Sequence, residues 1–196
     1  MSKNSIEVIT LNKPEITDFA KERNYLLQKS KAEWVFFVDS DEVVSKELKK
    51  EMDECLENQT INNFNGFYVK RKNYFLGQYA GTDKILRLGR RNAGKWKRRV
   101  HETWQVKGNI GQLENPLVHN TAKDLHEFIN KIDFYSTLHA KENLENGNKS
   151  NIIKIIFYPV FKFIQSMFTG RGFVMSMLQS FHSFLSWSKE WKLQNV

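Results

Sequence analysis

The sequence predicts a mixed α/β fold with amphipathic helices at its C-terminal end, and three observations indicate this class. An unbroken apolar run, WVFFV at 34–38, has the pattern of a strand covered on both faces in a parallel sheet. Helical stripes precede and follow this run. The segment from residue 152 onward is apolar, aromatic and basic. We therefore expect one domain over residues 1–144 and a helical tail over residues 151–196.

The elements on either side of the apolar run can be assigned in order. Residues Ser5–Leu11 predict a short strand, and Thr17 is expected to cap the helix that follows. The inward stripe of this helix includes Arg23, an unusual position for a charge. Ser45 is expected to cap the next helix, in which Cys55 is predicted to be a small buried hydrophobe.

The rest of the first domain has shorter apolar runs. Residues 64–119 contain brief apolar runs broken by Gly, Asn, Lys and Arg, and they predict short, partly antiparallel strands. Residues 123–143 predict a helix. Its inward stripe is expected to include Leu125, Phe128, Ile129, Ile132, Tyr135 and Leu138.

Charge and cysteine content restrict the environment and the partners. The single cysteine excludes an internal disulfide and favours a cytosolic setting. The formal net charge of +8 favours an anionic partner. We do not expect this partner to be nucleic acid, because basic and aromatic residues are not interleaved on one sheet face.

Carboxylates follow the buried strand directly. Asp39 and Asp41 stand at its carboxyl end, where ligands bind in open α/β sheets. Two carboxylates one residue apart can share a hard divalent cation that also binds substrate phosphates. The alternative is an acidic turn that helps to start the next helix.

The context of these carboxylates resembles a known family. The segment RNYLLQKSKAEWVFFVDSDE is similar to the middle of family 2 glycosyltransferases, which have the A-type nucleotide-diphospho-sugar fold. The later segments KILRLGRRNAGKWKRRVHETW and GQLENPLVHN resemble the branch that builds lipopolysaccharide core. The resemblance covers roughly residues 19–138, and several motifs in one order are more specific than any one. The residues that carry it are Arg23, Asn24, Asp39, Asp41, Arg87, Val100, His101, Glu102 and His119.

The resemblance implies a fold with a missing part. Members of the family begin with a strand and a second βα unit before the Arg-Asn pair, whereas this chain has only about 18 residues there. We therefore expect a truncated A-type glycosyltransferase sheet with flanking helices that lacks most of the nucleoside-binding half. Three alternatives follow: the chain is a fragment, it is a shortened protein that has lost donor binding, or a partner supplies the missing part. Such a partner would be a second copy in a homo-oligomer or a separate N-terminal chain.

The resemblance also implies a metal and a donor site. Asp41, with Asp39 and His119, is expected to bind Mg²⁺ or Mn²⁺. Arg23, Asp39 and Asp41 are expected to bind the diphosphate of a nucleotide-sugar donor. The alternatives are an ion pair between Arg23 and an aspartate, and a structural role for His119 in a loop.

A catalytic base and an acceptor site complete the expected chemistry. The resemblance implies that Glu102 is the general base and that His101 binds phosphate or orients Glu102. The alternative for Glu102 is a surface salt bridge with Arg98 or Arg99. The basic run from Arg87 to Arg99 is either a solvated face or a site for an acidic acceptor.

The tail predicts two amphipathic helices that attach to a membrane surface. The first lies over residues 152–168, and the second carries an aromatic stripe from Phe173 to Trp187. The alternative is that both helices pack onto the sheet domain or onto a second copy. Residues 152, 153, 156, 157, 160, 161, 164 and 168 form the apolar side of the first helix.

Taken together, these features and the resemblance predict a metal-dependent glycosyltransferase or a fragment of one, and the resemblance alone implies that the enzyme is inverting. It would move a sugar from a nucleotide diphosphate to a glycolipid or other saccharide acceptor of the lipopolysaccharide-core type. We expect it in the cytoplasm, peripheral on the inner face of the cell membrane. The alternative is a non-catalytic membrane-surface protein derived from such an enzyme.

Overall fold

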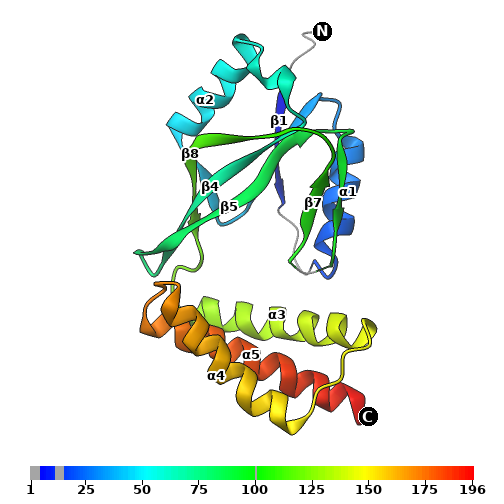
Figure 1. Ribbon diagram of the computed structural model, residues 1–196, viewed down its shortest axis with the longest axis vertical. Coiled ribbons are helices and arrows are strands. Elements are labelled where there is room, and N and C mark those ends of the chain that lie inside the picture. The colour runs from blue at the N-terminus through cyan, green and yellow to red at the C-terminus, as the bar shows by residue number, and fades with distance from the viewer. Residues whose placement is uncertain (1–4, 12–15, 100) are drawn as a thin grey trace. The chain divides into compact units, whose positions relative to one another are not determined.

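A computed structural model describes residues 5–11, 16–99 and 101–196, and it confirms the mixed α/β class (Figure 1). The contacts divide the chain into two units. The sheet unit comprises Met1–Asn73 and Thr82–Asn120, and the helical unit comprises Tyr74–Gly81 and Thr121–Val196. The contact boundary near residue 120 precedes the interval 144–151 in which the sequence analysis placed the domain boundary.

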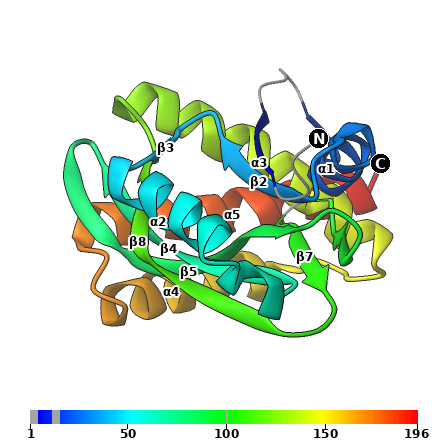
Figure 2. The same ribbon diagram turned by 90° about the horizontal axis from the view of Figure 1, so that it is seen from above.

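The sheet unit is built on a six-stranded sheet with the order β1-β2-β5-β4-β8-β3 (Figure 2). The first two strands are parallel, whereas β2 pairs with β5, and β3 with β8, in antiparallel fashion. A second sheet consists of β6 and β7. The bounds are β1 Ile6–Leu11, β2 Trp34–Asp39, β3 Glu42–Val44, β4 Gly66–Phe75, β5 Gln78–Arg90, β6 Gly94–Lys97, β7 Thr103–Val106 and β8 Ile110–Asn120.

Strand β2 is covered on both faces, as its consecutive apolar residues predict. Trp34, Phe36 and Val38 enter one core with side chains of helix α2, Lys46–Glu57. Val35 and Phe37 enter a second core with side chains of helix α1, Phe19–Lys29. Successive side chains of a strand point to opposite faces, so an unbroken apolar run feeds two cores at once.

The helix caps confirm one prediction and correct another. The Ser45 hydroxyl accepts a hydrogen bond from the Leu48 backbone N–H at 3.1 Å, so Ser45 caps α2. Helix α1 is capped by Asp18, whose side chain accepts from the Lys21 N–H at 2.8 Å. The prediction of Thr17 as the cap is therefore wrong by one residue. Asp18 takes the extended backbone conformation that a cap requires.

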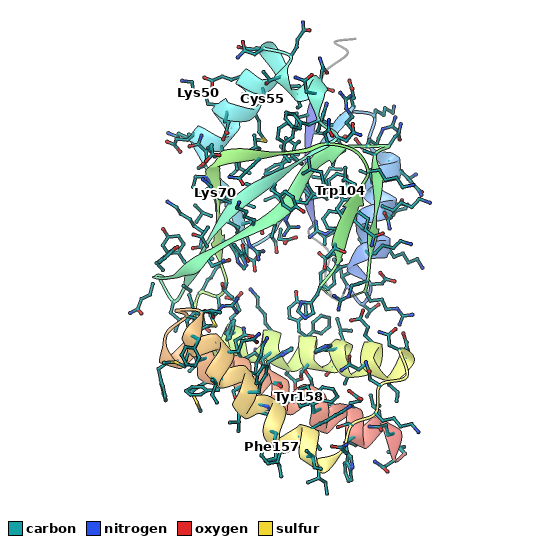
Figure 3. All side chains as sticks on the ribbon, viewed as in Figure 1. Lys50, Cys55, Lys70, Trp104, Phe157 and Tyr158 are labelled. Atoms are coloured by element: carbon teal, nitrogen blue, oxygen red, sulfur yellow. The ribbon has the colours of Figure 1, made fainter. Side chains whose placement is uncertain are left out.

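The strands between residues 66 and 120 are longer than their broken apolar pattern predicts. Strands β4, β5 and β8 contain 10, 13 and 11 residues. Phe67 and Val69 of β4, and Leu113 and Leu117 of β8, are buried at even spacings, so each pair lies on one face of its strand, as in sheets with one covered face. Cys55 is half-buried against the first core and lies on α2 in Figure 3, close to its predicted environment.

The helical unit contains three helices, α3 Leu125–Glu145, α4 Ile152–Phe168 and α5 Phe173–Gln194. Helix α5 packs against both α3 and α4. Phe128 and Ile132 of α3 form a core with Phe75 and Met175. Leu125 and Ile129 are exposed, so their predicted place in the inward stripe is wrong. The buried stripe instead includes Ser136 and Ala140, which let α5 approach closely.

Candidate functional site

The carboxylate at the end of β2 is held between two arginines. Asp39 accepts from Arg23 Nη2 at 2.5 Å through one oxygen and from Arg87 Nη2 through the other. Burial opposes ionisation of this carboxyl, and the charges of Arg87 and Arg23 outweigh it, so the pKa of Asp39 lies below its ordinary value. Asp39 is therefore ionised and fixed in orientation.

Arg23 explains the charge within the inward stripe of α1. Its side chain is only 1% exposed, and its guanidinium lies 4.7 Å from the ring centre of Trp96 and 5.3 Å from that of Phe37. Its Nε donates to Glu102 at 3.0 Å. The neighbouring Asn24 exchanges two hydrogen bonds with the Trp96 backbone, which fixes the aromatic side of this cage. The predicted alternative of an ion pair between Arg23 and an aspartate is thus present.

The ion pairs continue beyond Asp39 as a chain. Arg87 donates to Glu42 at 3.0 Å, and Glu42 also accepts from Arg71 at 3.2 Å. Arg71 binds Asp83 through two hydrogen bonds of 3.0 and 2.7 Å. Six ion pairs therefore join Glu102, Arg23, Asp39, Arg87, Glu42, Arg71 and Asp83 in that order. The second oxygen of Glu42 accepts from the Asp39 backbone N–H at 2.9 Å, which locks the turn between the two carboxylates.

Asp41 lies beside His119, the histidine that was expected to share its metal ion, and the metal site itself stays a prediction. Strand β3 places Glu42 opposite His119 on β8, and His119 Nε2 lies 3.5 Å from an Asp41 oxygen. The other ring nitrogen, Nδ1, lies 2.7 Å from Asn73 Oδ1. The amide nitrogen of Asn73 faces the Arg71 carbonyl at 3.5 Å, so the Asn73 oxygen is the group turned toward the ring. His119 Nδ1 then carries a hydrogen, and Nε2 is the ring nitrogen that faces Asp41.

This pair has the chemistry of a small cation site. A carboxylate oxygen and an imidazole nitrogen lie 3.5 Å apart, and both atoms are of kinds that bind divalent cations when the imidazole is neutral. The hydrogen bond from Nδ1 to an amide oxygen orients the ring as neighbouring groups do in metal sites. Within the described ranges no cluster of three or more His, Cys, Asp and Glu is placed to hold a metal ion. Asp39 faces two arginines, so the Asp41–His119 pair is the better candidate for contact with a cation, with substrate oxygens as further ligands.

The two predicted catalytic residues have different environments. Glu102 precedes β7 and is half-buried, with its carboxylate oriented by Arg23. His101 is exposed and has a left-handed backbone conformation, with φ of 54°. Val100, which belongs to the same motif, lies outside the described residues. The role of His101 remains a prediction.

The predicted basic run divides into two parts. Arg87 is buried in the chain of ion pairs, and Arg90 pairs with Glu33 and lies 4.8 Å from the ring centre of Trp34. Lys97, Arg98 and Arg99 line a groove of about 560 Å³ between α1 and β6, whereas Lys95 is exposed and lies outside this lining. The lining also includes Lys21, Tyr25 and Trp96. The basic side chains of the groove can therefore face an acidic ligand.

Arg71, Asn73, Asp83 and Trp96 were not predicted as parts of the site. Arg71 and Asn73 are two residues apart on β4, so they share one face of the strand. Two polar residues at that spacing could have indicated that this face of the strand contributes to a site. Trp96 gave no comparable signal, because its contact with Arg23 depends on the pairing of β6 with β7.

The mixed α/β fold is glycosyltransferase-like. A buried strand of a mixed α/β sheet ends in carboxylates beside a fixed arginine and a histidine. No protein-family model matches the chain. The assignment to the glycosyltransferase class rests instead on similarity to curated protein sequences.

Three of these relatives are named glycosyltransferases. The chain is 28% identical over 186 residues to the lipopolysaccharide core biosynthesis glycosyltransferase LpsC of Rhizobium meliloti (strain 1021), covering 87% of this chain and 68% of that protein. It is 24% identical to uncharacterized glycosyltransferases of Rickettsia typhi and Rickettsia prowazekii, covering 84% and 88% of this chain. The aligned parts are 66% and 70% of those two proteins. These matches confirm the resemblance to glycosyltransferases that the motifs predict, and the chain spans about two thirds of the length of these relatives.

Proposed function

We propose that this chain carries the cation-binding and acceptor-binding part of a glycosyltransferase site. The reaction would transfer a sugar from a nucleotide diphosphate to a saccharide acceptor, of the glycolipid or lipopolysaccharide-core type. The observation that carries the proposal is the pairing of Asp41 with His119 beside the arginine-held Asp39 and Glu102. The relative named for lipopolysaccharide core biosynthesis supports the choice of acceptor.

The charge of the site supports a requirement for a cation. The chain of ion pairs contains four carboxylates and three guanidinium groups, which leaves one net negative charge. Asp41 adds a second negative charge beside it. A diphosphate brings further negative charge, so its approach to this end of the sheet requires a counter-ion. Mg²⁺ or Mn²⁺ held by Asp41 and His119 would neutralise the leaving diphosphate as a Lewis acid.

Arg23 and Asp39 act in this scheme as a rigid support. One guanidinium nitrogen of Arg23, Nη1, is buried and has no hydrogen-bond partner within the described residues. The other nitrogens orient Asp39 and Glu102. The cage of Trp96 and Phe37 holds the guanidinium in place, so the two carboxylates keep a fixed geometry as ligands arrive.

Glu102 is the proposed general base. It would accept the proton of the acceptor hydroxyl as that oxygen attacks the anomeric carbon of the sugar. The bond from this carbon to the diphosphate oxygen breaks in the same displacement, so the configuration at the carbon inverts. Arg23 holds one carboxylate oxygen of Glu102 and thereby fixes the direction from which the base approaches.

The groove between α1 and β6 is the proposed acceptor site. Trp96 lines this groove and also covers the guanidinium of Arg23, so the groove and the ion-pair chain share a wall. Lys97, Arg98 and Arg99 would attract the acidic groups of a phosphorylated saccharide. Aromatic side chains such as Tyr25 and Trp96 provide apolar surface for a sugar ring.

The test measures cation-dependent binding of a nucleoside diphosphate. Isothermal titration with uridine diphosphate and guanosine diphosphate, with and without MnCl₂, would compare the natural chain with Asp41→Asn and His119→Gln. We expect binding only with Mn²⁺, and at least about tenfold weaker binding in both variants. Asp53→Asn, an exposed carboxylate on α2, is the matched control and should bind like the natural chain. Binding that ignores both Mn²⁺ and the Asp41 substitution would overturn the proposal.

A further inference from the structure

Helices α4 and α5 expose most of their large apolar side chains, whereas helices of globular proteins usually bury them. The largest side chains of α4 point outward, with Phe157, Phe161 and Phe168 exposed by 62%, 65% and 89%. In Figure 3 the labelled Phe157 projects from α4, whereas its neighbour Tyr158 packs on Trp187 of α5 at 4.8 Å between ring centres. The exposed apolar residues of α4 are Ile152, Ile153, Ile156, Phe157, Val160, Phe161, Ile164, Met167 and Phe168. At 100° per residue they occupy roughly half of the helix circumference.

The positions of α4 that are fully buried carry small side chains. Pro159 and Ser166 are its buried residues. Ser176 of α5 donates to the Ser166 hydroxyl at 3.1 Å, and Ser180 donates to the Pro159 carbonyl at 2.9 Å. Small residues and interhelical hydrogen bonds join helices that lie in lipid, because apolar side chains there gain nothing by facing inward. Two aromatic pairs, Tyr158–Trp187 and Phe163–Phe173, also join the helices. Most large side chains of α4 nevertheless remain exposed, whereas a helix pair in water buries its apolar face.

Helix α5 extends the exposed apolar surface. Phe173, Met177, Phe181 and Phe184 are exposed and recur at a spacing of three to four residues. Trp187 is turned inward. Lys154 Nζ lies 4.8 Å from the centre of its ring, which also contacts Tyr158. Both α4 and α5 therefore expose apolar side chains, mainly Phe and Ile, and neither helix exposes an acidic side chain.

The charges on these helices have one sign. Residues 146–196, all of which are described, contain six Lys or Arg and a single acidic side chain, Glu190. Glu190 is completely buried, and its burial raises its pKa. Its carboxylate accepts from Asn143 at 3.0 Å, inside the unit. Lys149, Lys162, Arg171 and Lys192 are exposed. The only charges that α4 and α5 offer to a partner are positive.

We propose that α4 and α5 dock side-on to a lipid bilayer that carries anionic headgroups. Their aromatic and aliphatic side chains would enter the interface, and the exposed Lys and Arg would contact the headgroups. A second copy fits this surface less well, since two faces with the same positive charge would repel each other. None of the described helices combines the length and apolarity needed to cross a membrane. This inference does not depend on the proposed sugar transfer.

Vesicle co-sedimentation of the whole chain tests this inference. The probes are phosphatidylethanolamine vesicles with about one third phosphatidylglycerol, and neutral phosphatidylcholine vesicles. We expect the natural chain to bind the anionic vesicles at least about tenfold more tightly than the neutral ones, because each exposed basic residue adds attraction. Glycerol phosphate at millimolar concentration should not release the protein from the vesicles, because a soluble headgroup offers no apolar layer for the aromatic side chains. Equal binding to both vesicles, release by glycerol phosphate, or no binding would each overturn the proposal.

Two double variants separate the apolar and the charged contributions. Phe157→Ser/Phe161→Ser should lower binding to anionic vesicles at least about tenfold, because these side chains supply buried apolar area. Lys162→Glu/Arg171→Glu should remove the preference for anionic vesicles. Val8→Ser/Tyr68→Ser, at exposed positions of the sheet unit, is the control and should bind normally. Unchanged helix content by circular dichroism shows that the variants are folded. A dimer in solution that Phe157→Ser/Phe161→Ser dissociates would instead identify this surface as an interface between copies.

Discussion

Asp39 is the residue on which the charge balance of the site depends. Replacing it with Asn leaves the buried Arg23 and the nearly buried Arg87 without their shared carboxylate. Breaking a buried pair by removing one partner costs about 3–5 kcal/mol, since the other charge stays desolvated. We expect Asp39→Asn to lower the free energy of unfolding by about this amount at pH 7, measured by urea denaturation. A loss below about 0.5 kcal/mol, comparable to that of Asp53→Asn, would contradict the argument.

The same residue predicts a pH dependence of stability. The pKa of Asp39 is lower in the folded than in the unfolded protein, because Arg87 and Arg23 outweigh its burial. Its contribution is therefore complete above the unfolded value of 3.8 and is lost as the pH falls through the folded value. The difference in stability between the natural chain and Asp39→Asn should shrink below about pH 4. Denaturation at pH 7, 5 and 3 would measure it, and a constant difference would contradict the assignment.

Glu102 provides a prediction about catalysis that depends on the proposed function. Glu102→Gln keeps an oxygen for Arg23 Nε but cannot accept the proton of an acceptor hydroxyl. We expect kcat to fall by about 10²–10⁴-fold with little change in KM. Steady-state transfer assays with a nucleotide-sugar donor and a lipopolysaccharide-core acceptor would measure both constants. An unchanged kcat would exclude Glu102 as the base while leaving the cation site intact.

At the scale of elements, β2 and α1 support the site through their packing. Phe37 of β2 contacts the rings of Trp96 and Trp104 edge-on, at 5.4 and 5.5 Å between ring centres. It also covers the guanidinium of Arg23 at 5.3 Å. We expect Phe37→Ala to cost about 3–5 kcal/mol, as for other large-to-small changes in a core. Chemical denaturation would measure this loss, and Val8→Ala on the exposed edge strand should have a much smaller effect.

Some elements could be predicted from local sequence, and others could not. The apolar run of β2 and the periodicity of α1 and α2 are local signals, and all three elements are present. The cap of α1 was misplaced because Thr17 and Asp18 are both good caps, and only the backbone conformation decides between them. Arg71, Asp83 and Asn73 were missed because their partners lie on other strands. The Asn73–His119 contact joins residues 46 positions apart.

At the scale of the whole molecule, the two units carry separable properties. The proposed cation site lies within the sheet unit, and the exposed apolar surface lies within the helical unit. We expect Phe157→Ser/Phe161→Ser to retain Mn²⁺-dependent binding of nucleoside diphosphates. Asp41→Asn should lose this binding and retain attachment to anionic vesicles. Titration and co-sedimentation of both variants would measure this. The loss of both properties in either variant would show that the units do not act independently.

The sequence predicted the outward side of α4 better than it predicted the grouping of α3. All eight positions assigned to the apolar side of α4 are exposed, because helical periodicity alone determines which residues share a face. The grouping of α3 with α4 and α5 depends on its contacts with α5. Contacts between distant segments leave no periodic signal in the chain.

The buried position of Glu190 has a consequence for how the helical unit would respond to acidification. No exposed side-chain carboxylate lies within residues 146–196, so between about pH 5 and 9 the sign of this surface stays constant. Its affinity for an anionic membrane should then not fall on acidification and should be sensitive to ionic strength. Reversal of attachment would depend on salt or on the lipid composition, and a fall in pH would not detach the protein.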